Sequence, residues 1–192
     1  MLTYRLVKNL IATQDSEWKQ LVKNSLGTNA HPRRIHSYCL SREALRLCFE
    51  ARGIRVAIGD LILEGFGAVK NHDLLTISLS HTPEFGAAVI AEIKDVVSVG
   101  IDIEPMERSV KATILERISH PEDIKLNALS IWSLKEAIFK AVMNSGKLKQ
   151  TVEFSELKID HETWVHEPSQ VRGQWKLEEQ QGLVVALAWI KI

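Results

Sequence analysis

The stretch VGIDIEPMERS, residues 99–109, reads as the end of a buried strand that carries two acids before a proline. In a β-strand, side chains two residues apart point to the same face. We therefore expect an acidic face that carries Asp102 and Glu104, and an apolar face that packs on a core. The apolar face would consist of Val97, Val99, Ile101 and Ile103. Two neighbouring carboxylates repel each other unless a cation, a proton or water lies between them. For this fragment alone, a solvated strand end is the simplest explanation.

The whole chain has the composition of an ordinary globular protein. Its 192 residues are 45% hydrophobic and 25% charged, which suits one larger domain or two small ones. Lysine plus arginine equals aspartate plus glutamate, 24 each, so the net charge indicates neither nucleic acid nor a membrane as a partner. No segment has the length and apolarity of a signal peptide or a membrane span. Cys39 and Cys48 lack metal-binding spacing, so we expect reduced, buried thiols in a cytoplasmic protein.

The apolar patterning divides the chain into strands and helices without a clear linker. Helices are expected at residues 15–26 (with Asp15 or Ser16 as the N-cap), 41–51, 109–118 and 121–143, the last one interrupted near 126–130. Strands are expected at residues 4–10, 54–58, 61–63, 74–79, 86–91, 96–104, 154–159, 174–178 and 183–190. Each half then runs strand, helix and several strands, so we predict an α+β fold, with two similar lobes as one possibility.

A second segment, WSLKEAIFKA at residues 132–141, places charges beside aromatic side chains. On a helix, Glu136 and Lys140 are neighbours four residues apart, and so are Trp132 and Glu136. An amphipathic helix with a Glu–Lys pair on its surface is the plain alternative. Trp132 and Phe139 flank the charged row, however, which indicates a buried wall where an acid needs a partner.

A third segment, LSHTP at residues 79–83, carries His81 at the end of a strand, between the hydroxyls of Ser80 and Thr82. Such a histidine can donate a hydrogen bond to an anion, and it can equally be a structural residue. The chain has no GxxxxGK[ST] or GxGxxG loop, so the usual nucleotide cradles are absent.

Taken together, the three segments indicate a single site for a cation and a phosphate group. Asp102, Glu104 and Glu136 could supply oxygen ligands to a hard divalent cation such as Mg²⁺. Lys140 would lie one turn beyond Glu136, beside the cation and a bridging phosphate oxygen, while His81 would meet another phosphate. The residues therefore indicate a Mg²⁺-dependent reaction on a phosphate ester.

The ordered set ISLSHT, VGIDIE and WSLKEAIFKA closely resembles the 4′-phosphopantetheinyl transferases of the surfactin-synthetase-activating and enterobactin type. The resemblance covers roughly residues 33–159 and is densest in the second half. It implies two pseudo-symmetric α+β lobes in one chain, residues 1–95 and 96–192, with the active site in the cleft between them. The implied reaction moves the 4′-phosphopantetheine arm of coenzyme A to a serine of an acyl or peptidyl carrier protein and releases adenosine 3′,5′-bisphosphate.

The resemblance also implies roles for the acids and the lysine. Asp102, Glu104 and Glu136 would hold Mg²⁺ against the diphosphate of coenzyme A. Glu136 and Lys140 would be catalytic, Glu136 as the base for the carrier serine and Lys140 as the partner of the diphosphate. Asp102 and Lys140 would thereby also belong to the coenzyme A site.

On the nucleotide side, the resemblance assigns coenzyme A binding to Ser80, His81, Arg34 and Arg42. His81, with Ser80 beside it, would contact phosphates of the adenosine portion, and Arg34 would meet the 3′-phosphate. The chain departs from the family here: a serine precedes Arg42 where a glycine is usual, and a Gly-Lys-Pro segment is missing, with Lys70 as its nearest counterpart.

Two other functional classes remain open at this point. A non-catalytic module of the same fold that binds coenzyme A or a carrier protein would be expected to lose an acid or the lysine. This chain has all four residues: Asp102, Glu104, Glu136 and Lys140. A phosphohydrolase would need a further dedicated base, and none stands out. We expect a monomer, because a two-lobe chain holds a complete site, and Lys147 and Lys149 could help an acidic carrier to dock.

Overall fold

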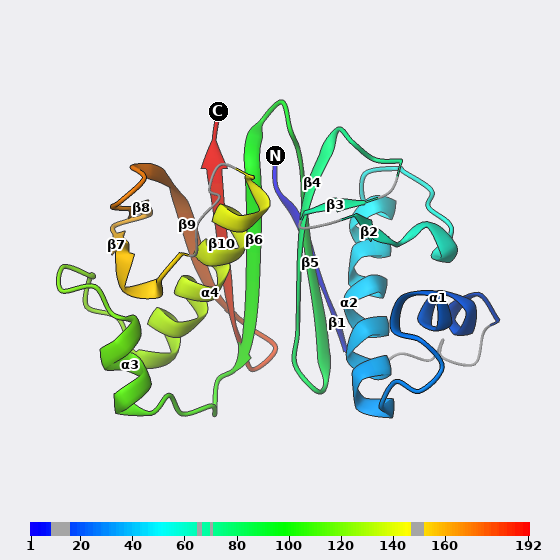
Figure 1. Cartoon of the computed structure of the whole chain (residues 1–192), viewed down its shortest axis with the longest axis horizontal. Coiled ribbons are helices and arrows are strands. Elements are labelled where there is room, and N and C mark those ends of the chain that lie inside the picture. Colours follow the sequence, from blue (N-terminus) through cyan, green and yellow to red (C-terminus); the bar gives the residue numbers. More distant parts are fainter. Residues whose placement is uncertain (9–15, 65–66, 70, 147–151) are drawn as a thin grey trace.

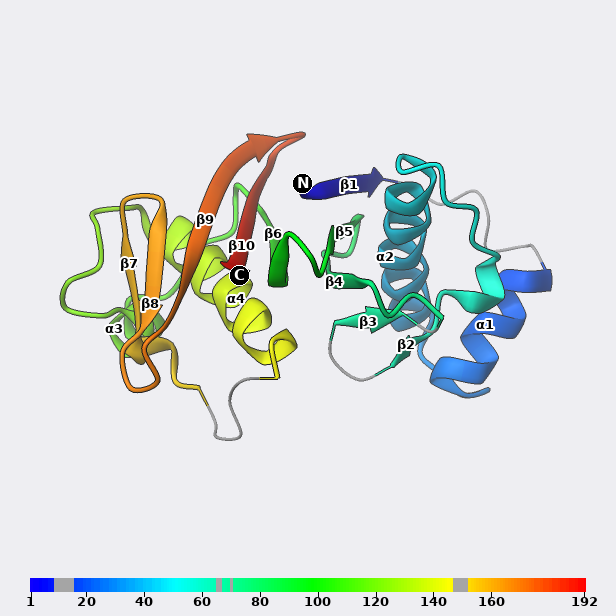
Figure 2. The same ribbon diagram turned by 90° about the horizontal axis from the view of Figure 1, so that it is seen from above.

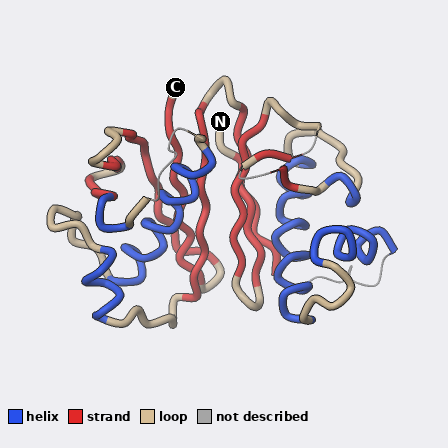
Figure 3. The backbone as a smooth tube through the Cα atoms, viewed as in Figure 1, coloured by secondary structure: helices blue, strands red, loops and turns tan. Residues whose placement is uncertain are grey.

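The computed structural model describes residues 1–8, 16–64, 67–69, 71–146 and 152–192. Its long strands lie in the middle with helices on either side, and two short strands lie at one outer edge (Figure 1, Figure 3). The helices are α1 (Ser16–Leu26), α2 (Pro32–Glu50), α3 (Ala112–Ile118) and α4 (Ala128–Asn144), with short 3₁₀ turns η2 (Ile58–Asp60) and η3 (Phe154–Glu156). The strands are β1 (Thr3–Lys8), β2 (Leu63–Glu64), β3 (Ala68–Val69), β4 (Leu75–His81), β5 (Phe85–Glu92), β6 (Val96–Pro105), β7 (Leu157–Asp160), β8 (Thr163–His166), β9 (Val171–Gln180) and β10 (Leu183–Lys191). The predicted α+β class is confirmed.

The strands of the described residues form three antiparallel sheets. The first has the order β1-β5-β4, the second the order β6-β10-β9-β8-β7, and β2 and β3 form a small separate pair. Helix α2 packs on the first sheet and helix α4 on the second, and β6 and β10 of the second sheet face the first sheet between these helices, while β7 and β8 lie on the far side of α4 (Figure 2). Apolar side chains from β5, β6 and β10 fill the space between the sheets. Two pseudo-symmetric lobes with a cleft between them stay a prediction.

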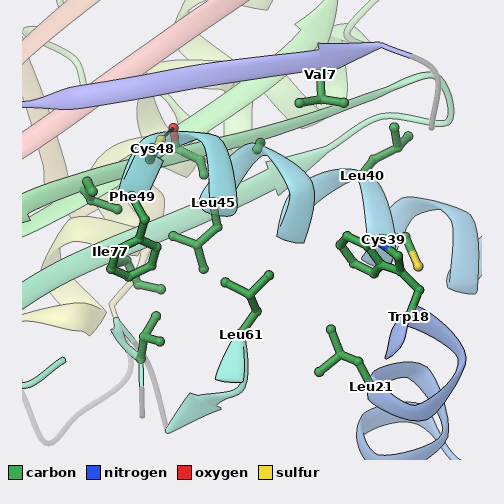
Figure 4. Close-up of a cluster of buried hydrophobic side chains, with 14 of the residues drawn as sticks. Val7, Trp18, Leu21, Cys39, Leu40, Leu45, Cys48, Phe49, Leu61 and Ile77 are labelled. Atoms are coloured by element: carbon green, nitrogen blue, oxygen red, sulfur yellow. Dashed lines mark hydrogen bonds between the residues drawn. The ribbon is translucent and has the colours of Figure 1, made fainter. Parts of the chain in front are cut away.

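Helices α1 and α2 and the first sheet share one hydrophobic core. Figure 4 shows side chains of this core, among them Val7, Trp18, Leu21, Leu45 and Phe49. Cys39 and Cys48 are buried and free, as the sequence predicts. Burial raises the pKa of the Cys48 thiol to about 12, so this cysteine is an apolar core residue and not a nucleophile. No helix in the described ranges has both the length and the apolarity to cross a membrane.

Helix α2 begins nine residues earlier than its apolar pattern predicts, at Pro32 rather than at residue 41. Proline is favourable in the first turn of a helix, where its missing N–H would have no partner. The Nδ1 atom of His31 accepts a hydrogen bond from the amide of Arg33 at 3.2 Å and caps the start. The strand expected at residues 54–58 is not formed, because this segment runs from the end of α2 into the turn η2.

Helix α4 begins later than the expected range of 121–143, at Ala128. The side chain of Asn127 accepts a hydrogen bond from the amide of Ser130 at 2.8 Å, which fixes the start at this point. The preceding residues form a turn in which Asp123 accepts from the amide of His120. Strand β8 was not expected from the sequence, and Asp15, Lys70, Lys147 and Lys149 lie outside the described residues.

Strand β6 is buried on both faces. Val99, Ile101 and Ile103 lie in the cluster between the two sheets, as the two-residue period predicts. Val97 does not: it packs with the core beside α4, and Val96 takes part in the cluster between the sheets instead. The reason is a register shift opposite residues 190 and 191 of β10, since one extra residue reverses the facing of the side chains beyond it.

Candidate active site

Helix α4 lies directly on β6 because Gly100 leaves no side chain between them. A Cβ atom at this position would lie 1.9 Å from the carbonyl oxygen of Ala137 and 2.7 Å from the amide nitrogen of Ala141. The hydroxyl of Ser98, on the same face of the strand, donates to the carbonyl oxygen of Ala141 at 2.6 Å. The acidic face of β6 is therefore covered by the helix, and its acids come within reach of the polar row on α4.

That row consists of residues spaced by four, which contact successive points of β6. The indole nitrogen of Trp132 donates to Oε1 of Glu104 at 2.8 Å. One turn beyond Glu136, the Nζ atom of Lys140 donates to Oδ1 of Asp102 at 2.7 Å and to the backbone oxygen at position 101 at 3.0 Å. Asp102 and Glu104 of β6 thus lie against the helix that carries Glu136 and Lys140, as the sequence suggested.

Asp102 is only 5% exposed, which excludes the solvated strand end. Its Oδ1 atom accepts from Lys140 and, at 2.9 Å, from the hydroxyl of Ser80 on β4. Its Oδ2 atom is buried and has no hydrogen-bond partner among the described residues. Burial raises the pKa of Asp102, and Glu104 raises it further, against the opposing effects of Lys140 and Ser80. One buried carboxylate oxygen is therefore left for a cation or a proton.

Glu104 is buried too, but its Oε1 atom is already used twice. It accepts from Trp132 and from the guanidinium of Arg108, four residues further along the chain. The guanidinium carbon also lies 5.0 Å from the centre of the Trp132 ring, which is a cation–π distance. Glu104 is thus neutralised by a residue that follows the end of β6.

Glu136 is half-buried and lies near both acids of β6. Burial raises the pKa of its carboxyl, and Asp102 and Glu104 raise it further, while Lys140 and Arg108 lower it. A carboxyl with a raised pKa is better matched to proton transfer near neutral pH than an ordinary glutamate. Glu136 therefore lies close enough to Asp102 and Glu104 for their charges to act on its carboxyl.

The end of β4 brings His81 to the same place. His81, Asp102, Glu104 and Arg108 are among the residues that line a pocket of about 360 Å³. The pKa of His81 is lowered, mainly by desolvation of the ring and further by the positive charges of Lys140 and Arg42, against the opposing effect of Asp102, which favours the neutral ring near pH 7. A neutral imidazole can donate one hydrogen bond to an anion.

The two arginines predicted for the nucleotide differ in their surroundings. Arg42 is largely buried: its Nε atom donates to the backbone oxygen of Leu61 at 3.2 Å, and its guanidinium lies 4.3 Å from the centre of the Tyr38 ring. Arg34 is exposed in the first turn of α2, and none of the described contacts joins it to the acid cluster. The charge of Arg42 lowers the pKa of His81, whereas Arg34 lies at the surface.

Side chains also join the neighbouring edges of β4 and β6. The hydroxyl of Ser80, besides donating to Asp102, accepts from the amide of Ile103 at 3.4 Å, and the hydroxyl of Ser78 accepts from the amide of Ile101 at 3.1 Å. At the end of α4, Asn144 donates to backbone oxygens of both strands, each at 2.9 Å. Because the Ser80 hydroxyl already serves this contact between the strands, its phosphate contact stays a prediction.

The predicted Mg²⁺ site is not confirmed. In the described part of the chain, no group of three or more His, Cys, Asp or Glu side chains is placed to hold a metal ion. The donor chemistry nevertheless suits a hard cation, because the cluster offers only carboxylate oxygens and one of them, Oδ2 of Asp102, is buried without a partner. Asp102 and Glu136 therefore have the donor chemistry that a divalent ion would use, whereas Oε1 of Glu104 is occupied by Arg108 and Trp132.

Lys135, beside Glu136 in the sequence, has a structural role that the sequence did not indicate. It is completely buried, forms an ion pair with Asp123 at 2.8 Å and donates to the backbone oxygen of Leu157. Burial lowers its pKa, and Asp123 opposes this effect. The Lys135–Asp123 ion pair connects the turn before α4 to the helix.

Arg108 and Asn144 were also missed. For Asn144, the spacing of four from Lys140 on α4 was the available signal, whereas Arg108 follows a strand, to which the helical spacing rule does not apply.

Residues 98–188 match the family model of the 4′-phosphopantetheinyl transferase superfamily. The matched segment is somewhat less than half of the 192 residues, and it contains Asp102, Glu104, Glu136 and Lys140 but not Ser80 or His81. No curated protein matches the chain. The predicted resemblance to the superfamily is thus confirmed for this segment, and the surfactin and enterobactin type stays a prediction.

Proposed function

We propose that the chain belongs to the 4′-phosphopantetheinyl transferase superfamily and transfers the 4′-phosphopantetheine arm of coenzyme A to a serine of an acyl or peptidyl carrier protein. The observation that carries the proposal is the meeting of Asp102, Glu136 and Lys140 where α4 lies on β6, with one buried carboxylate oxygen left for a cation. The family match covers the same three residues and supports a transferase.

The transfer needs one bond made and one broken. The serine oxygen of the carrier forms a bond to the phosphorus on the pantetheine side of the diphosphate, and the bond from that phosphorus to the bridging oxygen breaks. The serine proton passes to Glu136, directly or through water, and adenosine 3′,5′-bisphosphate leaves. Lys140, which already holds Asp102, stabilises the charge on the leaving oxygens.

A divalent cation, Mg²⁺ in this proposal, would be held by Asp102 and Glu136. Glu104 would join them after Arg108 has moved away from its carboxylate. The contribution of the cation would be to neutralise the diphosphate and to favour departure of the bisphosphate. In support of this assignment, Oδ2 of Asp102 is buried without a hydrogen-bond partner among the described residues, and the charges of Asp102 and Glu104 act on Glu136.

His81, Arg42, Ser80 and Arg34 form the nucleotide side of the proposed coenzyme A site. In support of this assignment, His81 lines the pocket beside Asp102, and the charge of Arg42 influences the pKa of His81. Arg34 has the weakest support, since it is exposed on the first turn of α2.

The division into lobes of residues 1–95 and 96–192 is part of the same proposal. In its support, each helix packs closely on its own sheet over a glycine: a Cβ atom at Gly86 would lie 2.1 Å from the backbone of Leu40 in α2, just as Gly100 admits α4. We further propose a monomer that acts in the cytoplasm.

The test is the intact mass of an apo carrier protein after incubation with this protein, coenzyme A and Mg²⁺. A gain of one phosphopantetheine that disappears with EDTA, and that is absent from a carrier whose serine is replaced by alanine, is the expected result. Glu136→Gln should abolish the gain, and normal turnover in that variant would contradict the assigned base. Coenzyme A binding without transfer to any carrier type would favour a non-catalytic binding module.

A further inference from the structure

Arg108 lies at the mouth of the acid cluster and makes two contacts there. Its guanidinium forms an ion pair with Oε1 of Glu104 and lies over the ring of Trp132, which itself donates to the same oxygen. The side chain of Arg108 is 43% exposed and that of Glu104 is 11% exposed, so the pair connects the buried cluster with the surface. Both residues line the pocket that also contains His81 and Asp102.

The charges of this cluster are distributed unevenly. Asp102 is paired with Lys140 and Glu104 with Arg108, whereas Glu136 forms no ion pair among the described residues. A cation that binds between these acids would face the guanidinium of Arg108 at the same carboxylate. Since like charges repel strongly in a partly buried site, the cation and the Arg108 guanidinium weaken each other's binding to Glu104.

A guanidinium has five N–H donors, and among the described residues Arg108 uses one of them in a hydrogen bond, towards Glu104. Its planar fork suits phosphate oxygens, which it binds with two parallel hydrogen bonds. The face of Trp132 gives the guanidinium a support that does not depend on Glu104. Arg108 can therefore leave the carboxylate and still remain beside the pocket.

We propose that Arg108 is a positioning residue that exchanges Glu104 for a phosphate group of the substrate when the divalent cation binds. This inference rests on the proposed function. Before the cation arrives, Arg108 holds Glu104 in place and neutralises it. Afterwards, Glu104 faces the cation and Arg108 faces the diphosphate. The cation and coenzyme A then bind with positive coupling, each increasing the affinity for the other.

The test measures binding in the absence of a carrier protein, so that no turnover occurs. Mn²⁺ affinity is followed by electron paramagnetic resonance, and coenzyme A affinity by calorimetry with and without Mg²⁺. Arg108→Gln should bind Mn²⁺ alone about fivefold more tightly, because a competing cation is removed. The same variant should bind coenzyme A about tenfold more weakly in the presence of Mg²⁺, because a charge-assisted phosphate contact is lost.

Two further variants sharpen the result. Arg117→Gln removes the same charge from an exposed position on α3 and should change neither affinity by more than about twofold. In a Glu104→Gln background, the gain in Mn²⁺ affinity caused by Arg108→Gln should disappear, because the competition takes place at that carboxylate.

An unchanged or weaker Mn²⁺ affinity in Arg108→Gln would overturn the exchange, and so would an absence of Mn²⁺ binding in both proteins. If the unaltered protein binds coenzyme A with Mg²⁺ and only the effect of Arg108→Gln is missing, the inference fails and the proposed function stands. If the unaltered protein does not bind coenzyme A at all, the proposed function fails and the inference fails with it.

Discussion

Replacing Gly100 by alanine tests the contact that builds the site. The new Cβ atom would lie 1.9 Å from the carbonyl oxygen of Ala137, whereas ordinary contact begins at 3.4 Å, so α4 must move away from β6 by about 1.5 Å. A rigid shift of that size would lengthen the 2.7 Å contact between Lys140 and Asp102 and the 2.6 Å bond from Ser98 to α4 to about 4 Å, beyond hydrogen-bonding range.

The cost can be worked from these contacts. Overpacking costs about 1–3 kcal/mol, and each lost hydrogen bond about 1 kcal/mol, so Gly100→Ala should destabilise the protein by about 3–5 kcal/mol. For a chain of 192 residues this corresponds to a fall in Tm of about 10 °C. Since a displacement of about 1 Å at reacting groups costs roughly a hundredfold in rate, carrier modification should fall at least that far.

Thermal unfolding and the intact-mass assay at a temperature where the variant is folded measure the two effects. Gly59→Ala is the matched control, because a Cβ atom there meets nothing within 4 Å and the backbone is not in the left-handed region; it should leave Tm and rate nearly unchanged. A Gly100→Ala protein with the Tm and the rate of the unaltered chain would refute the close packing of α4 on β6.

Three further changes have outcomes that follow from the cluster. The folded-state pKa of Glu136 is raised above its ordinary 4.5, so protonation of Glu136 stabilises the fold at low pH, and this stability is lost as the pH rises through the folded pKa. Glu136→Gln should therefore have a higher Tm than the unaltered protein at pH 8, and the difference should shrink towards pH 4.5. A difference in Tm that stays constant with pH would contradict the raised pKa. Asp123→Ala leaves the ammonium of Lys135 buried without its carboxylate and should cost about 3–5 kcal/mol in urea unfolding, so a cost below about 1 kcal/mol would mean that the pair is not needed. Lys140→Met should slow transfer strongly and also lower the free energy of unfolding by about 1–2 kcal/mol, because Nζ donates to both Asp102 and a backbone oxygen of β6. An unchanged denaturation midpoint would limit the role of the lysine to catalysis.

Local patterns predicted the elements that the site needs. The alternation of Val99, Ile101 and Ile103 identified β6 and its apolar face, and the spacing of four between Glu136 and Lys140 placed both on one face of α4. Both patterns are properties of a few neighbouring residues, so the sequence contains them in full. The register shift near Val97 is not such a property, because it depends on how β10 pairs with β6.

The α+β class, the acids, the lysine and the histidine of the candidate site, and the resemblance of residues 98–188 to a transferase superfamily could be read from the sequence alone. The partner of each group depends instead on how the elements pack together. Asp102 takes Lys140 and Ser80, Glu104 takes Arg108 and Trp132, and Lys135 goes to a buried acid. The reason is physical: periodicity states which side of an element a residue faces, whereas the pairing of charges depends on how closely two elements approach, and that distance is set here by Gly100.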